Sequence, residues 1–231
     1  MRWMLGPGYA GVGVFGALVA RSLLLGTPWW AAMAFNVVLA LAVLPLAGLA
    51  TRGGRLRPGW AVAWLLMWPN ALYLVTDLAH LHGRSPDSLW PDVASYGALA
   101  VCGVWIGVAT LLRVVDVVRG QLGPAAAAGS FATLCAAGGF GIWLGRVKRL
   151  NSWDVVTHPE RLVTSLRDVL HDPGQLEQAA VFVGLWGGGM AFVAACAALS
   201  RTTPTPLSTA ARPSSPLAGR RRVPAPGGST R

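Results

Sequence analysis

Six long apolar runs constrain the fold of this chain more than any other feature. They cover residues 6–25, 29–50, 60–81, 94–112, 124–145 and 179–200. Each run is about 19 to 22 residues long, and a helix needs roughly 20 residues to cross the 30 Å apolar core of a bilayer. Segments of about ten residues with alternating polarity, which a membrane β-barrel requires, do not occur. We therefore predict an all-α integral membrane bundle of six transmembrane helices within residues 1–200.

The composition agrees with this class. The chain has 231 residues, of which 54% are hydrophobic and only 12% charged, whereas about 25% of residues are charged in soluble domains. Leu18 occupies the place where a signal peptide cleaved after Ala20 needs a small residue, so we expect the first run to stay as a span. Residues 201–231 are rich in Pro, Ser and Arg, which predicts a disordered basic tail.

The distribution of charge predicts an orientation. With six spans, most of the 19 Lys and Arg residues fall on the side that receives both termini, and the positive-inside rule places that side in the cytoplasm. Almost all the acidic residues and all four histidines fall on the other side. We expect a plasma-membrane protein whose basic face and tail contact anionic membrane lipids. Nucleic-acid binding is not expected, because no soluble domain is present to hold such a site.

The third run contains the polar residues that are most costly to bury. Asn70, Tyr73, Asp77 and His80, followed by Arg84 just beyond the run, recur every three or four residues, so they share one face of a helix. Pro69 predicts a kink just before them. An ionisable group at membrane depth marks a site or a partner. One interpretation is an outward-facing polar pocket in which Asp77 acts as ligand or proton acceptor and His80 as its partner, both being catalytic candidates. The other is a network that locks helices together.

Three cations follow the fifth run, at Arg146, Lys148 and Arg149. Arg146 lies nearest the core and is expected either to bind a lipid phosphate or to pair with Asp77, Asp92 or Asp154, and its planar fork suits both roles. Lys148 and Arg149 are more typical of side chains that extend to the membrane surface. Asp92 lies where the fourth span is expected to begin, either in the same pocket or as an acid that stabilises the helix dipole.

An amphipathic helix is expected between the fifth and sixth runs. Thr157 to Glu160 have the pattern of a capping box, and apolar residues then recur at helical spacing until about His171. Such a helix lies at the membrane interface, here over the mouth of the bundle, either as a lid or as a simple strap.

Metal and partner signals are weak. His80 and His82 point about 200° apart on a helix, and no ligand spacing typical of a metal site occurs, so no metal site is predicted and no cofactor is indicated. Glycine pairs four residues apart indicate close helix contacts in spans four, five and six, and are also compatible with a homo-oligomer. They are Gly103/Gly107, Gly141/Gly145 and Gly184/Gly188.

Two segments resemble the hallmark motifs of a family of bacterial multi-pass membrane proteins, the domain-of-unknown-function 1361 family. These are residues 69–81 and 144–156, with a W-x-D element at Trp90 to Asp92 between them. The likeness covers roughly residues 29–200 and implies an integral membrane protein without an established activity. Lys148 departs from the family's usual apolar residue. The candidate binding residues are Asn70, Tyr73, Asp92, Arg146, Asn151, Trp153 and Asp154.

Three functions remain open at this point. The first is an enzyme that acts on a lipid or a lipid-linked substrate, with Asp77 as general base or metal ligand, His80 as its partner and Arg146 as the phosphate or oxyanion clamp. The second is a proton-coupled carrier in which Asp77 titrates. The third is a scaffold in which the polar stripe is structural.

Overall fold

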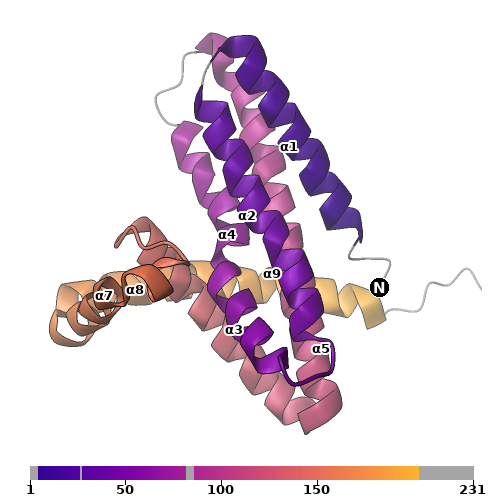
Figure 1. The fold of residues 1–231 in the computed structure, drawn as a ribbon, viewed down its shortest axis with the longest axis vertical. Helices are drawn as coiled ribbons and strands as arrows, with labels where there is room; N and C mark the ends of the chain where they lie inside the picture. Colours follow the sequence, from indigo (N-terminus) through magenta and orange to yellow (C-terminus); the bar gives the residue numbers. More distant parts are fainter. Residues whose placement is uncertain (1–4, 27, 82–85, 203–231) are drawn as a thin grey trace, which may run out of the picture.

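The computed structural model describes residues 5–26, 28–81 and 86–202, and every regular element in these ranges is helical (Figure 1). The expected tail therefore lies, from residue 203 onward, outside the described residues. The all-α prediction is confirmed. The elements are α1 (Leu5–Leu25), α2 (Pro28–Ala50), α3 (Arg57–Met67), α4 (Pro69–Thr76), the 3₁₀ turn η2 (Asp77–Leu81), α5 (Pro86–Arg146), α6 (Asp154–Thr157), α7 (Pro159–His171), α8 (Pro173–Phe182), the π-helical η3 (Val183–Gly187) and α9 (Gly188–Thr202).

Within the described residues, five helices are long and apolar enough to cross a membrane, where the sequence predicted six. Three of them match the first three apolar runs, and a fourth, Pro173–Ser200, contains the last run. The remaining one, Leu89–Arg146, has 58 residues. A straight helix of that length would measure about 87 Å, almost three times the apolar thickness of a bilayer. This single element contains both the fourth and the fifth expected spans.

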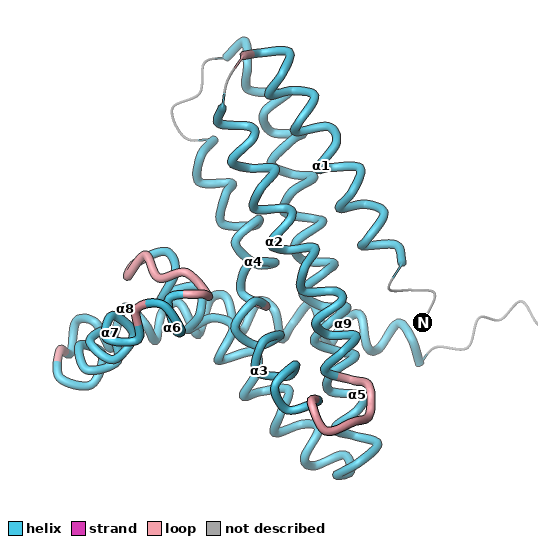
Figure 2. The backbone as a smooth tube through the Cα atoms, viewed as in Figure 1, coloured by secondary structure: helices cyan, strands magenta, loops and turns pink. Residues whose placement is uncertain are grey.

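Helix α5 is folded back on itself at Gly123. This residue has φ 87° and ψ 176°, a conformation that glycine adopts without steric cost, and Pro124 follows it. Both halves of α5 lie against α4: Gly103 faces the carbonyl oxygen of Ala71, while Gly141 faces Pro69. Residues 38 positions apart would be about 57 Å apart on a straight helix, so the halves must form a hairpin, as the backbone trace shows (Figure 2).

The expected kink in the third run is present. Helix α3 ends at Met67 and α4 begins at Pro69, with Trp68 between them. Pro69 has no N–H to donate, so the helical hydrogen-bond ladder is interrupted there. The Trp68 ring is fully buried, and its Nε1 donates to the carbonyl oxygen of Gly107 at 3.1 Å. The kink is thus held by α5.

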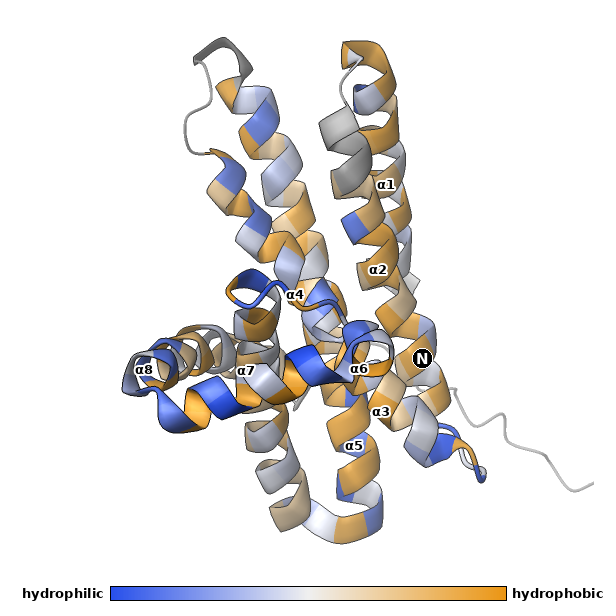
Figure 3. Ribbon diagram, turned by 60° about the vertical axis from the view of Figure 1, so that its left-hand side comes forward, coloured by the Kyte–Doolittle hydropathy of each residue, from blue (hydrophilic) through white to orange (hydrophobic). Residues whose placement is uncertain are grey.

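Helices α6 to α9 are arranged differently from the bundle. Helix α7 has one polar and one apolar face (Figure 3), as the sequence predicted, whereas α8 and α9 run across the long axis of α2 and α5 (Figure 1). This crossing brings Gly187 against the carbonyl oxygen of Cys135 and Met190 against Gly107, so the segment touches both halves of α5.

The predicted capping box is wrong. His158, not Thr157, precedes α7, and no side chain caps this helix. The Thr157 hydroxyl instead donates to the carbonyl oxygen of Trp153 at 3.1 Å. The short α6 ends at Thr157 and Pro159 begins the next helix, so the residue that would cap α7 is itself in a helix.

Candidate functional site

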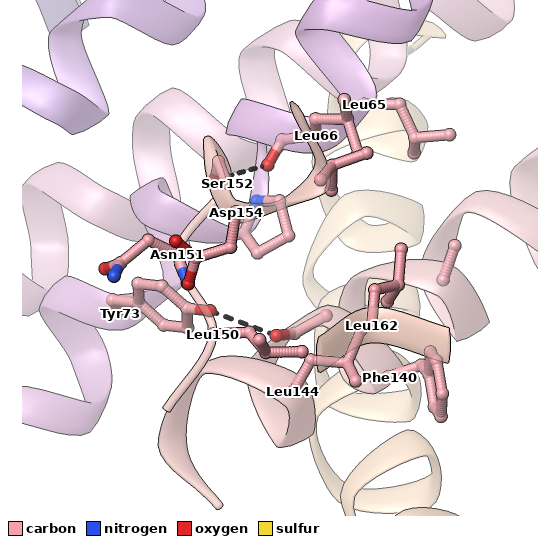
Figure 4. A pocket seen from close by; sticks show the side chains of 14 residues that line it. Leu65, Leu66, Tyr73, Phe140, Leu144, Leu150, Asn151, Ser152, Asp154 and Leu162 are labelled. Atoms are coloured by element: carbon pink, nitrogen blue, oxygen red, sulfur yellow. Dashed lines mark hydrogen bonds between the residues drawn. The ribbon is translucent and has the colours of Figure 1, made fainter. Parts of the chain in front are cut away.

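A cavity of about 170 Å³ lies beside the Pro69 kink (Figure 4). Its walls come from α3, α4, the second half of α5, the loop 150–153 with the start of α6, and α7. The lining is mainly apolar, and its polar members lie in α4 and in the segment that follows α5. The lining residues are Leu65, Leu66, Pro69, Tyr73, Ala137, Phe140, Gly141, Leu144, Leu150, Asn151, Ser152, Asp154, Val155 and Leu162.

The loop after α5 is attached to the kink by hydrogen bonds. The Ser152 hydroxyl donates to the carbonyl oxygen of Leu66 at 2.7 Å, in the last turn of α3 just before the kink. Asn70 Nδ2 donates to Ser152 Oγ at 3.0 Å and to the carbonyl oxygen of Met67 at 2.9 Å. Asn70 therefore holds the wall of the cavity, and its side chain does not join Asp77.

Tyr73 connects the cavity to the charged residues above it. Its hydroxyl donates to the carbonyl oxygen of Gly141 at 3.0 Å, and the close approach depends on Gly145, where an added Cβ would lie 1.7 Å from the Tyr73 oxygen. The guanidinium carbon of Arg146 lies 5.4 Å from the centre of the Tyr73 ring, a cation–π contact. Tyr73 thus both lines the cavity and contacts a cation.

Asp77 and Arg146 form a buried ion pair. Arg146 Nη2 lies 2.5 Å from Asp77 Oδ1 and also donates to the carbonyl oxygen of Tyr73 at 3.0 Å. Asn36 Nδ2, from α2, donates to Asp77 Oδ2 at 3.2 Å. The Asp77 side chain is only 1% exposed, whereas Arg146 is 33% exposed. Both carboxylate oxygens of Asp77 therefore accept a hydrogen bond. The negative charge of Asp77 is compensated by Arg146, which is the partner that reaches the protein surface.

His80 lies at the edge of this ion pair. Its Nδ1 is 3.0 Å from the carbonyl oxygen of Asp77 and 3.9 Å from Asp77 Oδ1. Its ring stacks on Tyr96 of α5, with centroids 6.3 Å apart. The Asp77–His80 contact that the sequence predicted is therefore present, but at the range of an ion pair and not of a side-chain hydrogen bond.

Asp92 belongs to a second ion pair and not to the first. It accepts from Nη2 of Arg21, which lies on α1, and Arg21 Nη1 donates to Pro91 O and Ser95 Oγ at 2.9 Å each. The expected dipole-stabilising role of Asp92 is wrong, because α5 already begins at Pro86. Asp92 instead ties α1 to α5.

The remaining candidates organise the segment after α5. Asp154 Oδ2 accepts from the backbone N–H of Asn151 at 2.8 Å and from Arg161 Nη1 at 3.1 Å. The backbone donor at Asn151, and then Arg161 and His158, hold the pKa of Asp154 below its ordinary value, while burial opposes them. Trp153 is 45% exposed. Asp154 therefore fixes the turn that closes one end of the cavity.

Lys148, the second of the three cations that follow the fifth apolar run, also has a partner. Its Nζ lies 2.6 Å from Asp168 Oδ2 of α7 and 5.5 Å from the centre of the Trp143 ring. It therefore helps to hold α7 against the end of α5.

Metal ligands do not gather among the described residues, where no group of three His, Cys, Asp or Glu side chains is placed to share an ion. His82 lies outside the described ranges, as does Arg84, which was expected on the face of Asp77.

Three important partners were not among the sequence candidates: Asn36, Arg21 and Ser152. The signal for Asn36 and Arg21 was present, since each is a polar residue inside an otherwise apolar run. Ser152 offered no such signal, because a serine in a loop is unremarkable without the geometry of the kink.

A protein-family model matches the region of the chain that contains this geometry. The model of the family described as "Protein of unknown function (DUF1361)" matches residues 35–192, more than half of the chain. The chain belongs to the DUF1361 family. The matched region holds Asn36, Asp77, Arg146 and the whole cavity, but not Arg21. No curated protein and no solved structure matches the chain.

Proposed function

We propose that this DUF1361 protein binds a membrane lipid, with part of an acyl chain in the cavity at the Pro69 kink and the phosphate group beside Arg146. The observation that carries the proposal is the position of Tyr73, which lines the apolar cavity and also lies under the Arg146 guanidinium. A single amphiphile can thus meet an apolar wall and a cation separated by one side chain. Lipid ligands require this combination of surfaces.

Arg146 retains the capacity to bind an anion. A guanidinium carries five N–H donors, and its contacts with Asp77 and Tyr73 are made through Nη2 alone. A third of its side chain is exposed. Arg–phosphate pairs are often bidentate, so the free edge of the fork is suited to a lipid phosphate while Asp77 holds the other edge in place.

The membrane arrangement that we propose counts α5 as two crossings, which gives six spans and places both termini in the cytoplasm of a plasma-membrane protein. The cavity then opens toward the outer leaflet, with α7 at the interface above it. Membrane lipids are the proposed partners. A homo-oligomer would use the face of Gly184 and Gly188, where an added Cβ meets nothing within 4 Å.

Catalysis is a further step that the geometry supports less well than binding. Both oxygens of Asp77 already accept hydrogen bonds, so a role as general base would require one of them to be released. Asp77 is better suited to position Arg146. The second candidate function, a proton-coupled carrier, is favoured by one observation: Asp77 lies between Arg146 and His80, so protonation of the carboxylate would free the arginine.

Photocrosslinking tests the proposal. Protein in nanodiscs containing phosphatidylglycerol with a photoactivatable acyl chain should be labelled in peptides that line the cavity. Ala137→Phe fills the cavity and should lower this labelling at least about 5-fold, whereas Ala132→Phe, on an exposed position of the same helix, should not. Equal labelling of both variants would overturn the proposal.

Lipid turnover distinguishes the enzyme from the binding protein. Conversion of the lipid, detected by mass spectrometry and lost in Asp77→Asn, would establish catalysis. Binding without conversion supports the proposal as stated. Thermal unfolding of each variant shows whether a loss of labelling reflects a loss of fold.

A further inference from the structure

The α2–α3 loop lies beside the turn of the α5 hairpin (Figure 2), and the segments that meet there carry five arginines. They lie in segments 51–57 and 113–122, which contain a single acidic residue, Asp116. Two hydrogen bonds join these segments: Arg57 Nη1 donates to Gln121 Oε1 at 2.8 Å, and Arg113 Nε donates to Thr51 Oγ1 at 2.7 Å. The two segments therefore form one surface with a strong excess of positive charge.

The arginines on this surface are of two kinds. Arg57 and Arg113 are used internally, since they join the segments, and Arg57 Nε also donates to the carbonyl oxygen of Ala50. The side chains of Arg52, Arg55 and Arg119 are exposed and make no hydrogen bond or ion pair with the part of the chain that the structure describes. Three guanidinium groups are thus held close to the surface with their donors directed to the surroundings.

Two large apolar side chains accompany these arginines. Leu56 is 73% exposed and Leu122 is 71% exposed, one in each segment. We call Arg52, Arg55, Arg119, Leu56 and Leu122 together the arginine face. Exposed leucines flanked by arginines fit the boundary between the headgroups and the acyl chains of a bilayer. They fit a soluble anion or a nucleic acid poorly, because neither offers an apolar layer.

We propose that the arginine face binds the headgroups of anionic phospholipids. Arginine forks bind phosphate oxygens, and an anionic leaflet attracts basic residues next to the ends of membrane helices. The contact is distinct from the cavity at Pro69, because none of these five residues lines that cavity. It would hold the α5 turn and the α2–α3 loop against the same leaflet.

Native mass spectrometry tests this proposal. The detergent-solubilised full chain should retain more phosphatidylglycerol than phosphatidylcholine, and the variant Arg52→Gln/Arg55→Gln/Arg119→Gln should lose this preference by at least about 5-fold. The control variant Arg220→Gln/Arg221→Gln/Arg222→Gln removes the same number of charges from the tail. Because the tail is also expected to contact anionic lipids, this control should lose some of the preference, but less than about 2-fold.

Two results would overturn the proposal: an unchanged preference in the variant of the arginine face, or an equal loss in the tail variant, which would assign the effect to net charge. If the Gln variant fails to fold, Arg52→Lys/Arg55→Lys/Arg119→Lys provides a second measurement. This variant keeps the three positive charges but lacks the bidentate guanidinium groups. It should therefore retain a preference for phosphatidylglycerol that 0.5 M salt abolishes. If the preference of this variant for phosphatidylglycerol were unchanged by 0.5 M salt, that result would count against a phosphate contact.

Discussion

Arg146 Nη2 lies 2.5 Å from Asp77 Oδ1, so the last residue of α5 is fixed to the first residue after α4. The same nitrogen donates to the carbonyl oxygen of Tyr73 one turn earlier. The pair therefore closes the α5 hairpin against the kinked third span. It also fixes the arginine over the ring that lines the cavity.

Asp77→Asn should destabilise the protein. The substitution leaves Arg146 without a countercharge, and breaking a buried ion pair by removing one partner costs about 3–5 kcal/mol. Because Arg146 is partly exposed, we expect a smaller loss, about 2 kcal/mol. Thermal unfolding in detergent measures it. The control is a double-mutant cycle with Arg146→Gln, in which the double variant should lose less than the two single variants together. Strict additivity would mean that the two side chains do not interact.

Gly103→Ala should weaken the packing of α5 on α4. An added Cβ would lie 2.2 Å from the carbonyl oxygen of Ala71, and backbone cannot move aside as a flexible side chain can. We expect a loss of about 1–3 kcal/mol. Gly97→Ala, on the same helix, meets nothing within 4 Å and should be neutral or slightly stabilising. A melting temperature that responds equally to both changes would contradict the close contact.

The sequence predicted the all-helical class, the apolar membrane helices and the kinked polar segment, because these follow from the cost of placing polar groups in lipid. An apolar run of about 20 residues has few structural alternatives, and Pro69 indicated the kink that separates α3 from α4. The spacing from Asn70 to Asp77 correctly indicated polar residues in this segment, yet it did not show that Asn70 would bind Ser152 and not Asp77. Local periodicity assigns a face but not a partner.

The parts that could not be predicted depend on contacts between distant segments. Asp92 pairs with Arg21 because α1 packs against α5, and no local sequence pattern indicates that packing. Similarly, the two apolar runs of α5 suggested a loop between them, whereas the helix continues to the single break at Gly123. The crossing of α9 over α5 could not be predicted from the sequence either. A helix with apolar residues on every side has no pattern that indicates which face packs against a neighbour or at what angle.

The segment after α5 should loosen at low pH. The pKa of Asp154 is lowered in the folded protein by the Asn151 backbone, Arg161 and His158. The stabilisation is therefore fully present above the ordinary value of 3.8 and is lost as the pH falls below it through the lowered value. Hydrogen exchange of α6 and α7, corrected for intrinsic rates, should increase in that range. In Asp154→Asn the exchange should be faster at neutral pH and should lack this transition, whereas a transition that persists would assign it to other carboxylates.

Cysteine accessibility in sealed vesicles should show whether α5 crosses the membrane twice. In a variant without Cys102, Cys135 and Cys196, single cysteines at Gly53 and Leu122 should react with a membrane-impermeant maleimide from the same side. They lie in the two segments joined by the Arg57–Gln121 hydrogen bond. A cysteine at the exposed Glu160 of α7 should react only from the opposite side, because in the proposed six-span arrangement the second half of α5 returns across the bilayer before α7 begins. If Leu122 and Glu160 reacted from the same side, the second half of α5 would not be a span. The six-span arrangement would then be wrong, and the cavity and the arginine face would belong to one leaflet.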